Sequence, residues 1–266
     1  MLNYNNVIPE NTSQHAAVAA SAQAWPAHFV LHKSEARGHA NHGWLNSYHS
    51  FSFGRYYDPN HMQFSVLRVI NDDVIAPSRG FGMHPHNDME IITYMLQGEL
   101  RHEDSLGNGS VIKAGDVQRM TAGTGIVHSE VNASQMEPSH LLQIWILPDT
   151  LNLTPSYEEK NFTRADKLNR WCLVAGKNGG VNNALSVNQS LDLYATTLDE
   201  TAPLDFTLNG NRSAYLHVAT GSVLLNGELL SAGDAVMIAA LNETQLLSVQ
   251  SQGGAEVLLF DLPPNE

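Results

Sequence analysis

Short apolar segments alternate along most of this chain with glycine, asparagine, aspartate and proline, and long apolar stripes with helical spacing are scarce. This alternation is typical of an all-β protein, in which short strands are separated by turns. The predicted strands are Phe64 to Ile70, Met89 to Leu96, Gly109 to Lys113, Val117 to Thr121, Leu141 to Leu147, Tyr215 to Thr220, Ser222 to Leu225, Ala235 to Ala239 and Ala255 to Leu262. Their close spacing favours a sandwich or a barrel.

Two stretches of the chain share one order of apolar segments and turns. In the first, Gly109 to Ala114 leads into the turn Gly115-Asp116; in the second, Glu228 to Leu230 leads into Gly233-Asp234. The two Gly-Asp turns lie 118 residues apart (233 minus 115). Such an internal repeat indicates two copies of one β-barrel module. The predicted organisation is a flexible N-terminal extension (1–26), an N-terminal barrel (27–148), a crossover segment (149–189) and a C-terminal barrel (190–266).

Composition excludes several classes of protein. The 27 acidic residues outnumber the 14 basic residues, and the resulting net charge of -13 repels phosphate backbones and anionic lipid. We therefore expect no direct nucleic-acid partner and no membrane partner, and no apolar run is long enough to span a bilayer. Cys172 is the single cysteine, so no internal disulfide can form, and we expect a small core residue in a cytoplasmic, reducing compartment. The N-terminus lacks the basic start of a signal peptide.

Two paired motifs carry the candidate chemistry. His84-Pro85-His86 places two imidazoles at positions i and i+2, which share one face of a strand. About forty residues later, His128-Ser129-Glu130 repeats this spacing with an imidazole and a carboxylate. On neighbouring strands of a barrel, the two pairs would converge on one interior point. For any one of these histidines an ordinary polar role is the simpler interpretation, but the paired spacing of all four residues favours a metal site.

Three imidazoles and one carboxylate suit a divalent transition metal such as iron, nickel, copper, manganese or cobalt, with coordination positions left open. A closed structural zinc site is a poorer match, because such sites usually recruit several cysteines.

The same motifs resemble the pirin family, and within it the bacterial pirin-like quercetin 2,3-dioxygenases. The resemblance extends from about residue 30 to the C-terminal Leu258 to Pro263, and the segments that carry it are Arg37 to Trp44, Tyr56 to Pro59, Gly80 to His86, Glu90 to Tyr94, His102 to Asn108, Gly115 to Gln118 and Met120 to Glu130. It implies two cupin barrels in one chain, of which the N-terminal barrel alone keeps a metal ion. The implied ligands are His84, His86, His128 and Glu130, and iron is the expected metal, with nickel, copper, manganese, cobalt or zinc as alternatives.

The resemblance also implies an activity. It is the oxidative ring opening of a flavonol such as quercetin, in which dioxygen is incorporated and carbon monoxide is released. Glu130 would ligate the metal and accept the substrate proton. A flat aromatic substrate needs an apolar slot. The candidates for this slot, for each of which a plain core role is the favoured interpretation, are Phe51, Phe53, Phe81, Met83 and Trp145.

Several alternatives stay open at this stage. A generic cupin offers a carboxylate soon after the His-x-His pair, which here is Glu90, as a ligand or as a partner that orients an imidazole. The protein could also be a metal-dependent regulatory module without turnover, although its acidic charge argues against that role. A cupin isomerase or sugar-binding protein matches the motifs less well.

The remaining histidines and the assembly have simpler expectations. His39 and His42 flank a glycine-rich turn and lack further ligands, His102 is expected to support a turn near the barrel mouth, and His217 is expected to be a satisfied core or surface residue. We expect a monomer, because two fused barrels can cover the faces that single cupins bury by dimerising.

Overall fold

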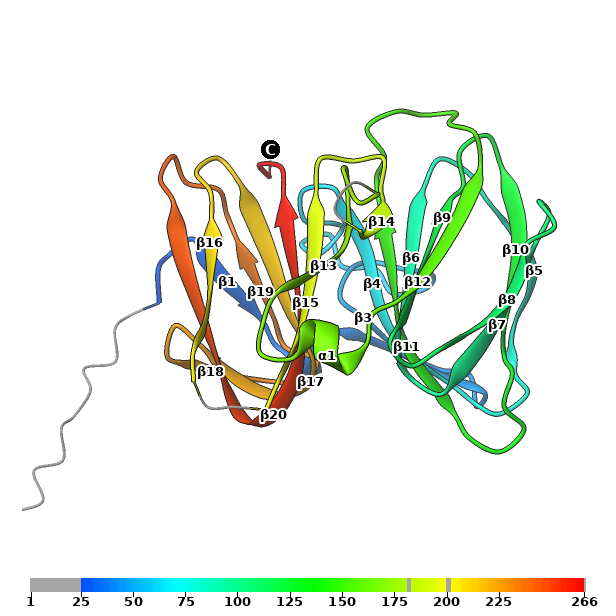
Figure 1. Ribbon diagram of the computed structural model, residues 1–266, viewed down its shortest axis with the longest axis horizontal. Helices are drawn as coiled ribbons and strands as arrows, with labels where there is room; N and C mark the ends of the chain where they lie inside the picture. Colours follow the sequence, from blue (N-terminus) through cyan, green and yellow to red (C-terminus); the bar gives the residue numbers. More distant parts are fainter. Residues whose placement is uncertain (1–24, 181–182, 200–201, 266) are drawn as a thin grey trace, which may run out of the picture.

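A computed structural model describes residues 25–180, 183–199 and 202–265 of the chain (Figure 1). Two β-barrels stand side by side in it, which confirms the predicted all-β architecture. The predicted flexible extension 1–26 lies outside the described residues except for Trp25 and Pro26. The ring of Trp25 packs edge to face against Phe29, with the ring centroids 5.8 Å apart. No helix in these ranges is long and apolar enough to cross a membrane.

Within the described residues, the strands form three sheets. The N-terminal barrel has a four-stranded sheet in the order β5 (Gly80–His86), β10 (Ile126–Asn132), β7 (Glu99–Asp104) and β8 (Gly109–Lys113). Facing it is a seven-stranded sheet in the order β12 (Ser156–Asn161), β9 (Asp116–Thr121), β6 (Glu90–Gln97), β11 (Ser139–Ile146), β4 (Leu67–Ile75), β3 (Leu45–His49) and β2 (Gly38–Asn41).

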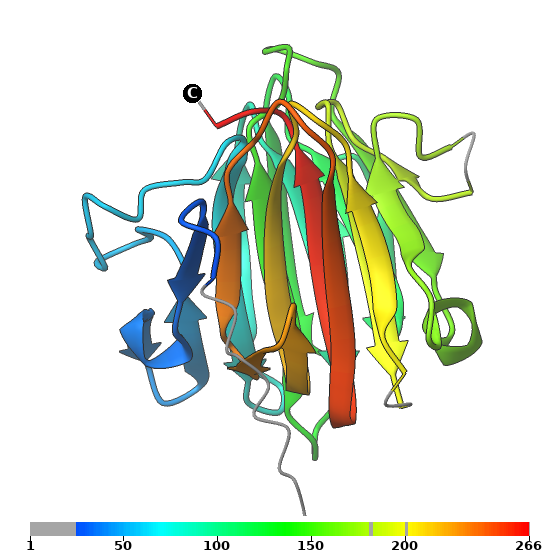
Figure 2. The same cartoon turned by 90° about the vertical axis from the view of Figure 1, so that its left-hand side faces the viewer.

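The C-terminal barrel is one nine-stranded sheet that curls on itself, seen face-on in Figure 2. Its path is β1 (Phe29–His32), β19 (Ala235–Ile238), β17 (Ser213–Leu225), β20 (Gln245–Leu262), β15 (Asp192–Leu198), β13 (Cys172–Gly176) and β14 (Leu185–Ser186), with β16 (Leu204–Leu208) on β20 and β18 (Glu228–Ser231) on β17. Register shifts in the long β17 let its two halves pair with different neighbours. A 3-10 turn (Ser34–Ala36) and the short helix α1 (Arg164–Lys167) complete the described elements.

The two barrels share one apolar core. Alternate residues of the seven-stranded sheet, such as Tyr94 and Leu142, point out of the N-terminal barrel and pack against Tyr215 and Phe260 of the C-terminal sheet. The intervening residues of the same strands point into the N-terminal barrel. Because both faces of these strands are covered, a shift of one residue in register would bury the wrong set of side chains. The packing between the barrels therefore fixes which side chains line the interior.

A buried polar contact ties the two barrels together beside this core. The ammonium of Lys167 donates to the Tyr94 hydroxyl and to the Glu256 carboxylate, at 2.7 Å in both cases. Lys167 is only 4% exposed, and a buried charge needs an opposite charge nearby. The Glu256 carboxylate of the C-terminal barrel provides it.

The repeat seen in the sequence has a matching backbone. Gly115 and Gly233 both have positive φ, at +90° and +85°, as each Gly-Asp turn leads into the next strand. Gly98 and Gly221 precede the repeated hairpins with φ of +75° and +74°. Glycine adopts these angles without strain, so the glycines at equivalent turns of the two copies have the same conformational role.

Strand pairing departs from the predicted domain boundaries in two places. β1, placed by prediction in the N-terminal barrel, pairs with β19 and extends the C-terminal sheet. β12, placed in the crossover segment, pairs with β9 and extends the seven-stranded sheet of the N-terminal barrel. Hydrogen bonding along a sheet edge does not depend on separation along the chain, so periodicity alone could not identify these partners.

Two buried histidines lie where the barrels meet. His32 on β1 and His217 on β17 both pair with Ala235 of β19, which places them on one face of the sheet. The prediction that His217 is satisfied is wrong, because neither of its ring nitrogens has a hydrogen-bond partner among the described residues. Burial lowers the pKa of each histidine to about 4. The charged groups that act on the pair are Arg37, Asp58, His61, Asp72 and Asp234.

This pair should make the fold sensitive to acid. Both histidines bind protons more tightly in the unfolded chain, where they titrate near 6.5, than in the folded protein. The free energy of unfolding should therefore fall as the pH drops from about 6.5 to about 4, by up to roughly 3 kcal/mol per histidine. Between pH 7.5 and pH 5, the free energy of unfolding measured by urea denaturation should fall less for His217→Leu than for the wild type. Equal losses would contradict this assignment.

Candidate metal centre

Two neighbouring strands of the four-stranded sheet carry the paired motifs. β5 and β10 are antiparallel, and His84 pairs directly with His128. His86 lies two residues along β5 and so shares the interior face with His84. The strand assignment predicted from the His-x-His spacing thus places three imidazoles on one wall of the barrel.

A bulge in β5 adjusts this wall. His84 pairs with His128, but Phe81 pairs with Glu130, so three residues of β5 span the distance that two residues of β10 cover. The bulge turns Phe81 toward the interior and leaves Met83 60% exposed on the outside.

The three imidazoles form a compact cluster. The ring centroid of His84 lies 4.4 Å from that of His128 and 4.8 Å from that of His86, and the His86 and His128 centroids are 4.9 Å apart. One ring nitrogen from each histidine lies within 4.8 Å of the others. A single ion between them could bind all three.

Hydrogen bonds and burial prepare these rings to bind a cation. His84 uses Nδ1 to donate to the Gly82 carbonyl at 2.8 Å, which leaves Nε2 as the nitrogen with a free lone pair. The buried Nε2 of His128 has no hydrogen-bond partner among the described residues. Burial and neighbouring histidines lower the pKa of His128 to about 3 and that of His86 to about 4, so both rings are neutral at pH 7. Neutral imidazole is the form that ligates a metal.

Glu130 lies beside this cluster with one oxygen already engaged. Its Oε1 accepts hydrogen bonds from the Gln143 amide at 2.7 Å and from the Thr93 hydroxyl at 3.2 Å. Its carboxylate forms a second group of potential ligands with His128 and His102 rather than joining the group of three imidazoles. His128 therefore links the imidazoles to Glu130, and Oε2 of the carboxylate is left for other contacts.

Glu90 does not contact the cluster. The segment between β5 and β6 turns at Asp88, which has a φ of +47°, and the two strands belong to different sheets. The fully buried Glu90 carboxylate accepts hydrogen bonds from the backbone amide and the side chain of Asn188, at 3.2 and 3.3 Å. The shared parity of residues 84, 86 and 90 was misleading because this turn interrupts the strand.

A cavity of about 800 Å³ opens in front of the imidazoles. The interior of the seven-stranded sheet contributes a polar row, since Thr93, Gln143, Asn71 and His49 pair across four adjacent strands. Three further lining residues of the cavity, Phe53, Phe81 and Trp145, are among the predicted slot residues. The cavity is therefore apolar on some walls and polar along one row.

Two of the predicted slot residues lie elsewhere. Phe51 packs against Tyr215 in the core between the barrels, with the ring centroids 5.6 Å apart. Met83 points outward from the bulge. The core interpretation, which the sequence favoured, is therefore the one that holds for Phe51. Met83 has the opposite parity to His84 and His86 on β5, and so it lies on the outer face of the strand.

Sequence reasoning also missed several cavity residues. The exposed His39 and His42 line the cavity together with Arg55. Asp73 lines it from β4 and is only 2% exposed, with Oδ1 unpaired among the described groups. Apart from the resemblance of the segment Arg37 to Trp44, no local pattern indicated them, because the cavity is lined by residues from strands that are distant in the chain.

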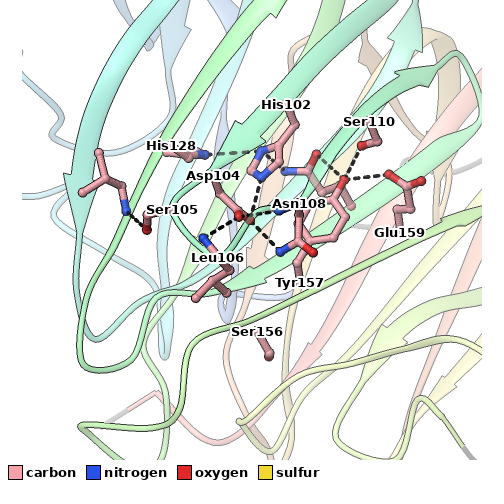
Figure 3. A network of polar contacts seen from close by, with 12 residues as sticks. His102, Asp104, Ser105, Leu106, Asn108, Ser110, His128, Ser156, Tyr157 and Glu159 are labelled. Atoms are coloured by element: carbon pink, nitrogen blue, oxygen red, sulfur yellow. Dashed lines mark hydrogen bonds and ion pairs between the residues drawn. The ribbon is translucent and has the colours of Figure 1, made fainter.

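His102 differs from its expected role. It is fully buried on β7 and faces the interior beside His128, instead of supporting a turn near the mouth (Figure 3). The adjacent turn is supported by Asp104, which accepts hydrogen bonds from the backbone amides of Leu106 and Asn108.

Comparison with known proteins identifies the family. The family model described as Pirin matches residues 30–146, and the model described as Quercetinase C-terminal cupin domain matches residues 173–262. The chain is 46% identical over 234 residues to the Escherichia coli (strain K12) protein named quercetin 2,3-dioxygenase, covering 88% of this chain and 98% of that protein. The chain belongs to the pirin family. The resemblance seen in the sequence and the bicupin fold are thereby confirmed.

Other pirin-family proteins extend the comparison. A protein from Caulobacter vibrioides named pirin-like protein is 40% identical over 224 residues, which cover 84% of this pirin-family chain and 95% of that protein. The crystal structure of the bacterial pirin YhhW from Escherichia coli in complex with nickel(II) is similar to this pirin-family fold with a TM-score of 0.82 at 46% identity, covering 89% of this chain and 99% of that one.

Asp73 should weaken the fold at neutral pH. Burial, together with the charges of Asp72 and Glu130, raises its pKa to about 7, from 3.8 in a free side chain. As the pH rises from about 4 to about 7, the unfolded chain gains a favourable ionisation that the folded protein lacks, so the stability contributed by the neutral carboxyl is lost. In metal-free protein, Asp73→Asn should therefore gain free energy of unfolding relative to the wild type across this range, by at most a few kcal/mol. Denaturation at pH 5 and pH 8 would measure the free energies of unfolding of the variant and the wild type. If the variant's advantage does not increase between these pH values, the raised pKa of Asp73 is contradicted.

Proposed function

We propose that this pirin-family chain binds one divalent transition-metal ion through His84, His86, His128 and Glu130 and opens the ring of a flavonol-like substrate with dioxygen, releasing carbon monoxide. The convergence of three imidazoles at the wall of a cavity of about 800 Å³ carries this proposal. The names of the relatives support it, since one is called quercetin 2,3-dioxygenase and a related bacterial pirin binds nickel(II).

The donor set fits such an ion. The Nδ1 of His84 is engaged, so its Nε2 is available, and the buried Nε2 of His128 has no hydrogen-bond partner among the described residues. A cation bound there would satisfy the His128 nitrogen. When bound, the ion would act as a Lewis acid toward a substrate oxygen and leave positions open for dioxygen. Three nitrogens and one oxygen are compatible with iron, which we expect, and with nickel.

Glu130 is proposed to accept the proton of the substrate hydroxyl. Its Oε1 is held by Thr93 and Gln143, which fixes the orientation of the carboxylate and directs Oε2 as the remaining acceptor. The low exposure of Glu130, 4%, keeps bulk water from competing for that oxygen.

The cavity walls are proposed to hold a flat aromatic molecule. Trp145 meets His86 edge to face, with the centroids 5.0 Å apart, and Phe53 packs against Trp145 in the same manner at 5.4 Å. These rings offer apolar surface next to the imidazoles, while the polar row of the seven-stranded sheet, to which Trp145 also belongs, offers partners for hydroxyl groups.

The test is reconstitution of the metal-free protein under anaerobic conditions with iron(II) or nickel(II), followed by oxygen uptake and loss of flavonol absorbance. We expect metal-dependent turnover in the wild type. The double variant His84→Ala, Glu130→Ala should lose it, because two of the four donors are gone. Its affinity for the metal should fall by more than the roughly 100-fold typical of losing a partner that only orients a ligand.

A matched pair of carboxylate variants tests the assignment of Glu130. Glu130→Gln should abolish turnover, because the amide cannot take up the substrate proton. Glu90→Gln should keep both metal affinity and turnover within a few-fold, since an amide oxygen can still accept from Asn188. The reverse pattern would assign the role to Glu90, and metal binding without turnover across a flavonol panel would contradict the dioxygenase function.

A further inference from the structure

A buried hydrogen-bonded pair lies behind the candidate metal ligand His128. In the pairing of β7 with β10, Asp104 lies opposite His128 and His102 lies opposite Glu130. Figure 3 shows the His102 ring between His128 and Asp104. His102 has no solvent exposure, and Tyr157 from β12 stacks on its ring with the centroids 4.7 Å apart. Tyr157 therefore covers one face of the ring, and the ring is shielded from solvent.

Asp104 determines which nitrogen of His102 carries the proton. Its Oδ1 accepts from the backbone amides of Leu106 and Asn108, at 2.9 and 3.0 Å, and its Oδ2 accepts from the Asn108 side chain at 2.9 Å. Although burial opposes ionisation, hydrogen bonds from Asn108 and His102 lower the pKa of Asp104. A carboxylate surrounded by donors can only accept, so the His102 Nε2, 3.2 Å away, must carry a proton.

The other nitrogen of His102 is then an acceptor. A neutral imidazole with its proton on Nε2 has a lone pair on Nδ1. The amide nitrogen of Gln118 approaches this Nδ1 at 3.3 Å and can donate to it. Nδ1 of His128 lies 3.5 Å from the same nitrogen of His102. His128 can therefore share it only as a donor, with its own proton on Nδ1.

We propose that His102 and Asp104 are positioning residues that hold His128 with its proton on Nδ1 and so leave its Nε2 lone pair free to bind the metal. The inference rests on the proposed role of His128 as a ligand. It explains why the buried Nε2 of His128 has no partner among the described residues, while its Nδ1 has one. Partners of this kind fix the tautomer and the ring orientation of metal-bound histidines.

A cation between His102, His128 and Glu130 is the competing interpretation, since these three also offer ligand atoms within 4.8 Å of one another. Both nitrogens of His102 already have partners within 3.5 Å. His102 would have to give up its contact with Gln118 to bind an ion. The orienting role requires no rearrangement.

The experiment measures nickel(II) affinity by chelator competition, together with the protonation of histidine nitrogens in metal-free protein by long-range 1H–15N NMR. We expect His128 in the wild type to be protonated on Nδ1 and His102 on Nε2. His102→Leu removes the acceptor and should weaken nickel(II) binding by about 10- to 100-fold. His102→Asn, whose side-chain oxygen can accept near the position of Nδ1, should restore part of the affinity.

Leu100→Ala is the matched control for a purely structural effect. Leu100 is fully buried on the same face of β7 but packs against Ile112 and Met95, away from His128. The variant should lower the melting temperature and leave nickel(II) affinity within about two-fold of the wild type, unlike the loss expected when an orienting partner is removed.

The outcomes separate this inference from the proposed function. If His84→Ala abolishes nickel(II) binding while His102→Leu binds like the wild type, the metal site stands and the orienting role is overturned. If His84→Ala also binds like the wild type, the proposed metal site itself has failed. A His128 ring protonated on Nε2 in the metal-free protein would overturn the orienting role whatever the affinities.

Discussion

The packing of the seven-stranded sheet against the C-terminal barrel is the constraint on which the candidate site depends. Strands β4, β6 and β11 bury one set of side chains between the barrels and the alternate set inside the N-terminal barrel. Each apolar side chain fully buried between the barrels contributes roughly 1.5–3 kcal/mol, and this packing of the outer face fixes the register of the strands. On the inner face, the same register places Thr93 and Gln143 where both donate to Glu130.

The two barrels differ in what fills them. Inside the C-terminal barrel, the corresponding strands contribute apolar side chains that pack into a core, including Leu216, Val218, Val257 and Leu259. In the N-terminal barrel, histidines, glutamine and carboxylates take interior positions and a cavity remains. The two copies of the module therefore differ in their interiors. Close apolar packing stabilises the C-terminal copy, and convergent polar groups line a cavity in the N-terminal copy. Among the described residues, both groups of potential metal ligands lie in the N-terminal barrel.

The polar interior is a connected structure rather than a set of separate ligands. Glu130 is held by two strands of the facing sheet, His84 by the carbonyl of Gly82 in the bulge, and His128 by His102. Each contact fixes one atom and leaves another free to face the cavity. Such preorganisation matters for a site that binds a cation, because side chains ordered in advance lose less entropy on binding.

By itself, the sequence determined the fold class, the duplicated module and the residues that bring chemistry to the first copy, because strand periodicity and turn glycines are local properties. His84, His86 and His128 could be predicted to converge, since i and i+2 positions share a face. Only the tertiary structure decided the rest. The bulge in β5, the separation of Glu90 from the site and the placement of His102 behind His128 depend on pairing between strands distant in the chain. Which sheet edge β1 joins and which aromatic rings face the cavity were decided in the same way, by contacts that local patterns do not encode.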